Sequence, residues 1–213
     1  MNTLRVDVWF DVICPWCLIG KRSLGAALKV LHARRPDVAV DISWHSYPLM
    51  PDTPSCGVPY VGFYLSRLGS SGAVSRRQAQ VREAASAAGV EIAFERIQVF
   101  PNTLAAHALV AQAQREGGAA NAEATIEALF DAYFMQGQDI GSTTVLNAVA
   151  ERCGIVGEAP ASALRPHAGA AHGVPFFRFN GAVSVEGAQR PAMLVGAMEH
   201  ALDQQPSMTG AAW

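Results

Sequence analysis

Hydrophobic and polar residues alternate at the start of the chain and again near residue 40. Val6, Val8 and Phe10 alternate with other residues, and the segment 38–44 repeats the pattern. An alternation of period two is typical of a β-strand. Between them, residues 18–34 place leucines at roughly helical spacing. A strand, a helix and a second strand predict a right-handed βαβ unit with parallel strands.

The middle of the chain has a different pattern. A proline-rich loop at 48–54 leaves the predicted sheet, and residues 58–166 are alanine-rich with helical periodicity. The apolar face is clearest over 126–134, where hydrophobic residues recur at i, i+3, i+4, i+7 and i+8. Asn102 or Thr103 is placed to cap one helix, and Gly117-Gly118 is placed at a helix end. These features predict several antiparallel helices inserted after the βαβ unit.

A β-hairpin is predicted late in the chain. Asn180-Gly181 lies between the short apolar runs 176–179 and 182–185, and Asn-Gly in this setting is the strongest short-range hairpin signal. A last helix is expected over 189–202. The order βαβ, helices, ββα predicts an α/β fold.

The chemistry of the chain centres on Cys14-Pro15-Trp16-Cys17, between the first strand and the first helix. A C-x-x-C pair beside a βαβ pattern is the redox motif of the thioredoxin-like fold. Proline is tolerated in the first turn of a helix. The helix N-terminus favours a thiolate at Cys14, while Cys17, one turn later, is expected to be less exposed. The pattern predicts an attacking thiolate at Cys14 and a resolving thiol at Cys17.

Composition narrows the function classes. The net charge is −2 and no block of Lys or Arg is present, which argues against nucleic acid as a partner. No apolar run of about 18 residues predicts a membrane span, and no signal peptide is recognised. A disulfide scaffold is not expected from four cysteines in 213 residues. A cytoplasmic location is therefore expected.

The cysteines, Asp11 and His107 can each be interpreted in more than one way. A structural zinc site is the main alternative for the cysteine pair. Tetrahedral zinc takes four ligands, which would require a second cysteine pair or added histidines, so no metal is expected. Cys153 on an apolar helix face is expected to be a buried small side chain, and Cys56 in a loop to be exposed. Asp11 is interpreted as a turn residue, with an influence on Cys14 as the alternative. His107 is interpreted as part of helix packing.

The chain resembles the DsbA-like branch of the thioredoxin superfamily, and within it the FrnE-type proteins. The resemblance covers about residues 6–202. The segments that carry it are Phe10-Asp11-Val12-Ile13-Cys14-Pro15-Trp16-Cys17, Pro101-Asn102-Thr103 with Ala106-His107, Gly173-Val174-Pro175-Phe176-Phe177, and Val185-Glu186-Gly187-Ala188-Gln189. It implies a thioredoxin-like domain in two parts, 1–54 and 169–204, around a large all-helical insertion, 55–168, with a tail at 205–213.

The resemblance also implies site residues. A cis Pro175 would pack against the cysteine pair, and Val174 would present its backbone to substrate. Pro15 and Trp16 would shape the site, with a role at the start of the helix as the alternative for Trp16. His172 is interpreted as a solvated loop residue, with substrate binding as the alternative, and Asn102 is a further candidate for substrate binding. The implied activity is thiol–disulfide exchange on a protein or small molecule that contains a disulfide or dithiol.

Two further functions stay open. Relatives of this family include kappa-class glutathione transferases and 2-hydroxychromene-2-carboxylate isomerases, which typically have serine where Cys14 stands and use glutathione. A glutathione-dependent isomerase or transferase is therefore the alternative to the oxidoreductase, and a small-molecule-binding module is a third. No bound cofactor is expected, with glutathione as a redox partner or co-substrate, and a homodimer is left open.

Overall fold

The computed structural model of the protein describes residues 2–156 and 173–204. The elements run in the order β1 (Asn2–Phe10), α1 (Pro15–Arg34), β2 (Val38–Ser46), β3 (Val58–Pro59), α2 (Tyr60–Leu68), α3 (Ser71–Ala87), a 3₁₀ turn (Phe94–Arg96), β4 (Val99–Phe100), α4 (Leu104–Phe130), a π turn (Asp131–Met135), α5 (Thr143–Arg152), β5 (Phe176–Phe179), β6 (Val183–Glu186) and α6 (Pro191–Asp203).

The central sheet has the strand order β2-β1-β5-β6. β1 and β2 are parallel, and β5 and β6 continue the sheet with antiparallel pairing. Residues 180–182 join β5 to β6. Asn180 and Gly181 have φ of 49° and 72°, and two such positive values are required by a type I′ turn. The predicted thioredoxin-like α/β fold is confirmed.

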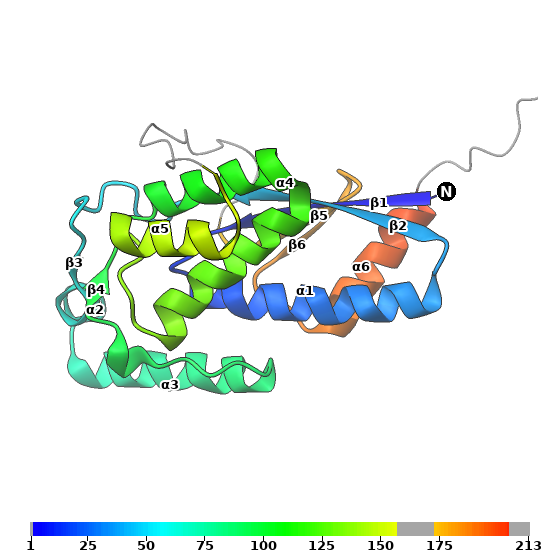
Figure 1. Cartoon of the computed structure of the whole chain (residues 1–213). Helices are drawn as coiled ribbons and strands as arrows, with labels where there is room; N and C mark the ends of the chain where they lie inside the picture. The colour runs from blue at the N-terminus through cyan, green and yellow to red at the C-terminus, as the bar shows by residue number, and fades with distance from the viewer. Residues whose placement is uncertain (1, 157–172, 205–213) are drawn as a thin grey trace, which may run out of the picture.

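One face of the sheet is covered by α1 and α6, which pack against each other (Figure 1). Leu4, Val6 and Val8 alternate toward these helices and are at most 2% exposed. On α1, Leu24 and Leu31 are equally buried. The hydrophobic residues that alternate in this part of the sequence therefore form the inward face of the central strand.

The helices α2 to α5 lie at the end of the sheet where β1 ends and α1 begins (Figure 1). The predicted end near Gly117-Gly118 is present as a kink in α4, where Gly118 has φ of 71°. The expectation of an all-helical insertion is wrong, because the insertion contains two short strands: Val58–Pro59 pairs antiparallel with Val99–Phe100. Runs of two residues are too short to give an alternation, so the pattern along the chain did not reveal them. None of the described helices is long and apolar enough to cross a membrane.

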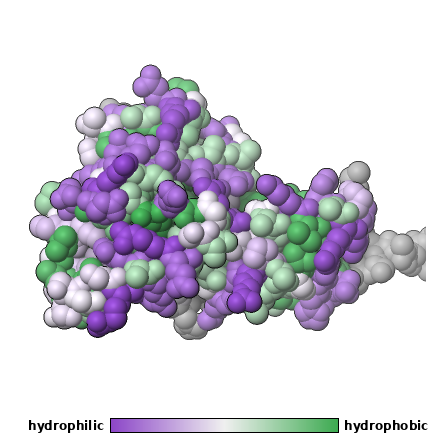
Figure 2. Space-filling model, turned by 90° about the horizontal axis from the view of Figure 1, so that it is seen from below, coloured by the Kyte–Doolittle hydropathy of each residue, from purple (hydrophilic) through white to green (hydrophobic). Residues whose placement is uncertain are grey.

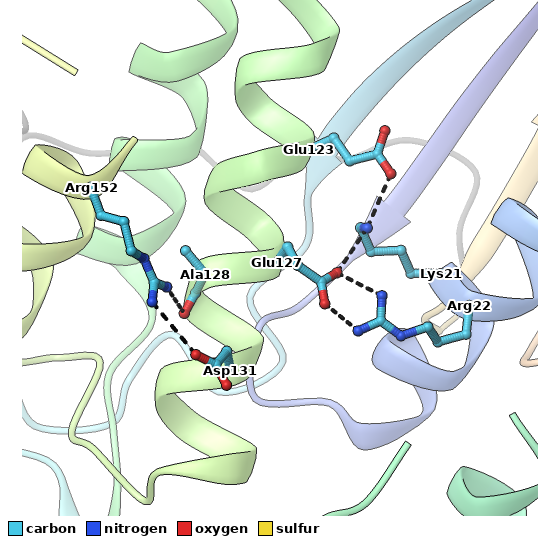
Figure 3. Close-up of polar contacts among 7 residues, drawn as sticks. All are labelled: Lys21, Arg22, Glu123, Glu127, Ala128, Asp131 and Arg152. Carbon is cyan, nitrogen blue, oxygen red and sulfur yellow. Dashed lines mark hydrogen bonds and ion pairs between the residues drawn. The ribbon is translucent and has the colours of Figure 1, made fainter. Parts of the chain in front are cut away.

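Ion pairs connect the insertion to α1 (Figure 3). Lys21 Nζ lies 3.1 Å from Glu123 and 3.0 Å from Glu127, and Arg22 also pairs with Glu127. The Lys21 side chain is only 9% exposed, so it is screened less than an ordinary surface charge. These contacts hold α4 against the first two turns of α1. The insertion is thereby fixed beside the cysteine pair.

The close packing of α1 against the segment before β5 gives a first test. A Cβ on Gly20 would lie 2.9 Å from Pro175 Cγ and 3.2 Å from Phe177 Cζ, whereas a Cβ on Gly25 meets nothing within 4 Å. We predict that Gly20→Ala lowers the free energy of unfolding by about 1–2 kcal/mol, because overpacking outweighs the gain in helix propensity. Gly25→Ala should raise it by about 0.5–1 kcal/mol.

Urea unfolding of both variants measures this difference. Gly25→Ala is the matched control, because it makes the same chemical change on the same helix. Equal stabilisation by the two substitutions would show that α1 does not pack tightly against Pro175.

Candidate active site

Cys14 lies at the junction between β1 and α1. Its backbone is extended, with φ −89° and ψ 111°, and it is the N-cap of α1, with Pro15 in the first turn. Its N–H donates to Asp11 O at 3.1 Å, and its carbonyl accepts from Cys17 N at 2.9 Å. The Cys14 thiol is thereby placed at the helix end that carries unpaired N–H groups and partial positive charge.

The two thiols have different surroundings. Cys14 Sγ donates to the carbonyl of Val174 at 3.8 Å and lines a cavity. Cys17 is 2% exposed, and its Sγ accepts from Asp11 N at 3.5 Å. All four cysteines of the chain lie in the described residues, and all four are free thiols. The pair is therefore in its reduced form, with one thiol at the cavity and the other behind it.

Burial raises the pKa of the Cys17 thiol well above its ordinary value. The hydrogen bond with Cys14 and the charge of Cys14 raise it further, against the lowering effect of the Asp11 N–H. At neutral pH Cys17 is thus a thiol while Cys14 is unreacted. The Cys17 thiol becomes easier to deprotonate once Cys14 carries no charge, because that charge is one cause of its raised pKa.

The segment before β5 lies against Cys14. The Val174–Pro175 bond is cis, as the family resemblance implied. Gly187 N donates to Pro175 O at 2.8 Å, which fixes the segment to the start of the loop after β6. Val174 is half-buried and turns its carbonyl oxygen to Cys14.

A buried acid–histidine pair lies beneath the cysteines. Asp11 and His107 are both fully buried, and Asp11 Oδ1 lies 3.1 Å from His107 Nε2. Asp11 Oδ1 also accepts from Ile13 N at 3.4 Å, and Oδ2 from Leu49 N at 2.6 Å. A buried carboxylate needs such donors to offset its lost hydration. Asp11 is therefore a turn residue, as interpreted, and also joins three separate segments.

The cavity beside Cys14 has a volume of about 460 Å³. Two helices of the insertion form much of its wall. Each contributes residues at i, i+3, i+4 and i+7: Tyr60, Phe63, Tyr64 and Arg67 from α2, and Val74, Arg77, Gln78 and Val81 from α3. Trp16 and Met50 line it from the other side. The cysteine pair alone does not make this site; the insertion completes it.

Aromatic side chains dominate the cavity wall. Phe63 stacks on Phe100 with ring centroids 3.7 Å apart, and Tyr60 lies 4.8 Å from Tyr64. Burial raises the pKa of Tyr60 to about 12. Burial, and then the charges of Tyr60 and Cys14, raise the pKa of Tyr64 as well. Both tyrosines are therefore neutral at physiological pH and keep a hydroxyl that can donate.

The predicted site residues lie in different places. Pro15 and Trp16 line the cavity, and Val174 and Pro175 lie on the other side of Cys14. The prediction for His172 falls outside the described residues.

Asn102 does not line the cavity. Its Nδ2 donates to Pro51 O at 3.2 Å and to Thr53 O at 2.6 Å, and its Oδ1 accepts from Leu104 N at 2.9 Å. It joins the proline-rich loop to the start of α4. The N-cap of α4 is Thr103, the other predicted candidate, and Asn102 directly precedes it. A role in substrate binding stays a prediction.

The sequence reasoning missed the cavity residues of α2 and α3. Their signal was present, because Tyr60, Phe63, Tyr64 and Arg67 have the spacing of one helix face. The pairing of Asp11 with His107 was also missed, since 96 residues separate them along the chain. No local pattern indicates that they meet.

The remaining cysteines lie away from the pair. Cys56 is exposed, as expected, and Cys153 is half-buried at the end of α5. Among the described residues, no group of three or more His, Cys, Asp or Glu side chains gathers in a way that could hold a metal ion.

Comparisons with known proteins agree with this architecture. A family model described as a DSBA-like thioredoxin domain matches residues 5–199. Protein YwbO of Bacillus subtilis, which is uncharacterised, is 27% identical over 164 residues, covering 76% of this chain and 72% of that protein.

Solved structures share the fold. The crystal structure of a probable DsbA oxidoreductase from Streptomyces coelicolor has a TM-score of 0.81 and 23% identity, covering 98% of this chain and 94% of its own. A 2-hydroxychromene-2-carboxylate isomerase has a TM-score of 0.63 and 17% identity, covering 97% of this chain and 100% of its own. At these identities the likeness establishes the fold.

The surroundings of Cys17 predict its titration. In a Cys14→Ala variant, the Cys17 thiolate should form only above pH 9.0, the ordinary thiol value, because burial is the largest cause of its raised pKa. The rise in ultraviolet absorbance of the thiolate measures this. Subtracting the curve of Cys14→Ala/Cys17→Ala isolates Cys17. A transition below pH 9.0 would contradict the prediction.

The Asp11–His107 pair predicts a loss of stability. His107→Ala removes a donor from a buried carboxylate and leaves a cavity, so the free energy of unfolding should fall by about 3 kcal/mol. His32→Ala, on the exposed side of α1, is the control and should change it by less than about 0.5 kcal/mol. Urea unfolding measures both; similar values for the two variants would mean that His107 does not support Asp11.

Proposed function

Because the chain belongs to the DsbA-like thioredoxin family, we propose that it is a thiol–disulfide oxidoreductase with Cys14 as nucleophile and Cys17 as resolving thiol. One observation carries this proposal. Cys14 opens to a cavity at a helix N-terminus and faces the carbonyl before a cis proline, with a second free thiol one turn behind it.

The proposed reduction proceeds in two exchanges. The Cys14 thiolate attacks one sulfur of the substrate disulfide, a bond forms between them, and the other sulfur leaves as a thiolate with the electron pair of the broken bond. Cys17 then loses its proton and attacks Cys14 Sγ, which releases the second substrate thiolate. In total two electrons pass to the substrate, and the enzyme dithiol becomes a disulfide.

The order of the two thiols follows from their surroundings. Cys14 borders the cavity, so a substrate sulfur reaches it first. In the mixed disulfide Cys14 no longer carries a charge or its own proton, which removes two of the causes that raise the pKa of Cys17. The Asp11 N–H is already directed at Cys17 Sγ and stabilises the thiolate that forms there. Cys17 is thus activated by the first exchange.

The residues around the pair have supporting roles in this proposal. The Val174 carbonyl positions the Cys14 sulfur, and Pro15 and Trp16 shape the wall on which the substrate rests. Glutathione is the proposed redox partner: two molecules of it reduce the enzyme disulfide and become glutathione disulfide. The net direction depends on the reduction potential of the pair relative to its compartment. The FrnE-type assignment, the cytoplasmic location and a homodimer stay predictions.

A redox titration tests the proposed function. After equilibration in graded mixtures of reduced and oxidised glutathione, the protein is alkylated and each cysteine is assigned by mass spectrometry. We expect one reversible two-electron transition, assigned to Cys14 and Cys17. A Cys17→Ala variant should instead accumulate glutathione on Cys14, because nothing resolves the mixed disulfide.

Cys153→Ala is the matched control, because it removes another non-exposed cysteine outside the motif and should leave the transition unchanged. If the pair never closes, the oxidoreductase proposal fails. An isomerase or transferase would then need Cys14 but tolerate Cys17→Ala, and a binding module would tolerate loss of both.

A further inference from the structure

Building on the proposed thiol–disulfide chemistry, we propose that the cavity selects compact, mainly apolar disulfides or thiols that carry an anionic group. The sulfur would lie at Cys14, the apolar body against the aromatic wall, and the anionic group at Arg67 and Arg77. Disulfides in long extended peptides would be poorer substrates.

The size and wall of the cavity support a small molecule. Its volume of about 460 Å³ lies within the range of small-molecule sites, roughly 300–1,000 Å³. Beside the cysteine, the wall is formed mainly by aromatic and aliphatic side chains, among them Phe63, Phe94 and Phe100. A peptide backbone placed there would lose water without finding enough hydrogen-bond partners. An apolar body has no such cost.

Helix α3 turns apolar side chains toward the cavity. Val74 and Val81 of α3 line the cavity, while the neighbouring residues Arg76 and Gln80 are exposed. Figure 2 shows the molecule from below, where α3 lies along the surface, and most of that face is hydrophilic.

The charge of the cavity wall has one sign. Among the described residues, Arg67 and Arg77 line the cavity and no carboxylate does. Within the described part of the chain, neither guanidinium takes part in an ion pair at 4.0 Å or less; Arg77 donates only to the neutral Gln80 side chain, at 2.8 Å. A guanidinium binds a carboxylate through two parallel hydrogen bonds. The two arginines therefore suit an anionic end group.

The arginines lie on the same cavity as the Cys14 thiol, and Arg77 contacts the cysteine motif. Arg77 Cζ lies 5.5 Å from the ring centroid of Trp16, between the two cysteines in sequence. The hydroxyl of Tyr64 interacts electrostatically with Cys14, Arg67 and Arg77. Cys14, Tyr64, Arg67 and Arg77 all line the same cavity, so one small molecule that fills it can contact the thiol and the arginines together.

The test compares two aromatic disulfide probes. Dithiobis-nitrobenzoate carries two carboxylates, whereas dithiodipyridine is neutral at neutral pH, and both release a coloured thiol. Second-order rate constants are measured with the reduced full chain carrying Cys56→Ala, so that the exposed thiol does not react. Arg67→Met and Arg77→Met are tested singly and together. Arg76→Met is the matched control, because it removes the same charge from α3 outside the cavity.

We expect the double variant to react about tenfold more slowly with the dianionic probe, and within about twofold of the parent with the neutral probe. The neutral probe reports the intrinsic reactivity of Cys14. Arg76→Met should change neither rate by more than about twofold, because an exposed charge outside the site is screened by solvent and salt. Raising the ionic strength should slow only the dianionic probe.

The outcomes separate this inference from the proposed function. If mass spectrometry finds neither probe on Cys14, the oxidoreductase proposal fails. If both probes react at Cys14 but the arginine variants slow them equally, or not at all, the oxidoreductase stands and the anionic selectivity is wrong. Faster reduction of insulin disulfides than of the aromatic probes, relative to dithiothreitol, would overturn the selectivity in favour of peptides.

Discussion

The buried carboxylate of Asp11 is the constraint on which the site depends. Fully excluded from water, it must find its donors within the protein. They come from the turn at Ile13, the loop at Leu49 and the side chain of His107 on α4. Its backbone also contacts both cysteines, by accepting from Cys14 N and donating to Cys17 Sγ. Three distant segments and the reactive pair are thereby held in one arrangement.

The insertion turns this arrangement into a binding site. Glu127, near the end of α4, pairs with Lys21 and Arg22 of α1 (Figure 3), whereas His107, near the start of α4, contacts Asp11. With α4 held at both places, α2 and α3 enclose the space in front of Cys14. A sheet with α1 and α6 alone would expose the thiol on an open surface. The insertion gives it a wall, an apolar interior and two positive charges.

The two thiols differ in their surroundings. Cys14 lies at the helix N-terminus and beside the cavity, whereas Cys17 is buried, which raises its pKa. In the proposed function, reactivity and selectivity come from different parts of the chain. The turn between β1 and α1 supplies the dithiol, and α2 and α3, which follow β2 in the chain, supply the contacts that select the substrate.

The sequence alone determined the elements whose signals are local. Val6 and Val8 alternate, Asn180-Gly181 fits only a tight hairpin, and Cys14 and Cys17 have one-turn spacing, so the strands, the hairpin and the dithiol could be predicted. The tertiary structure decided what those elements meet. The contact of Asp11 with His107, and the joint position of Arg67 and Arg77 beside Cys14, depend on chain folding over many residues. Local patterns fix which face of a helix is buried, but not which distant face it will pack against.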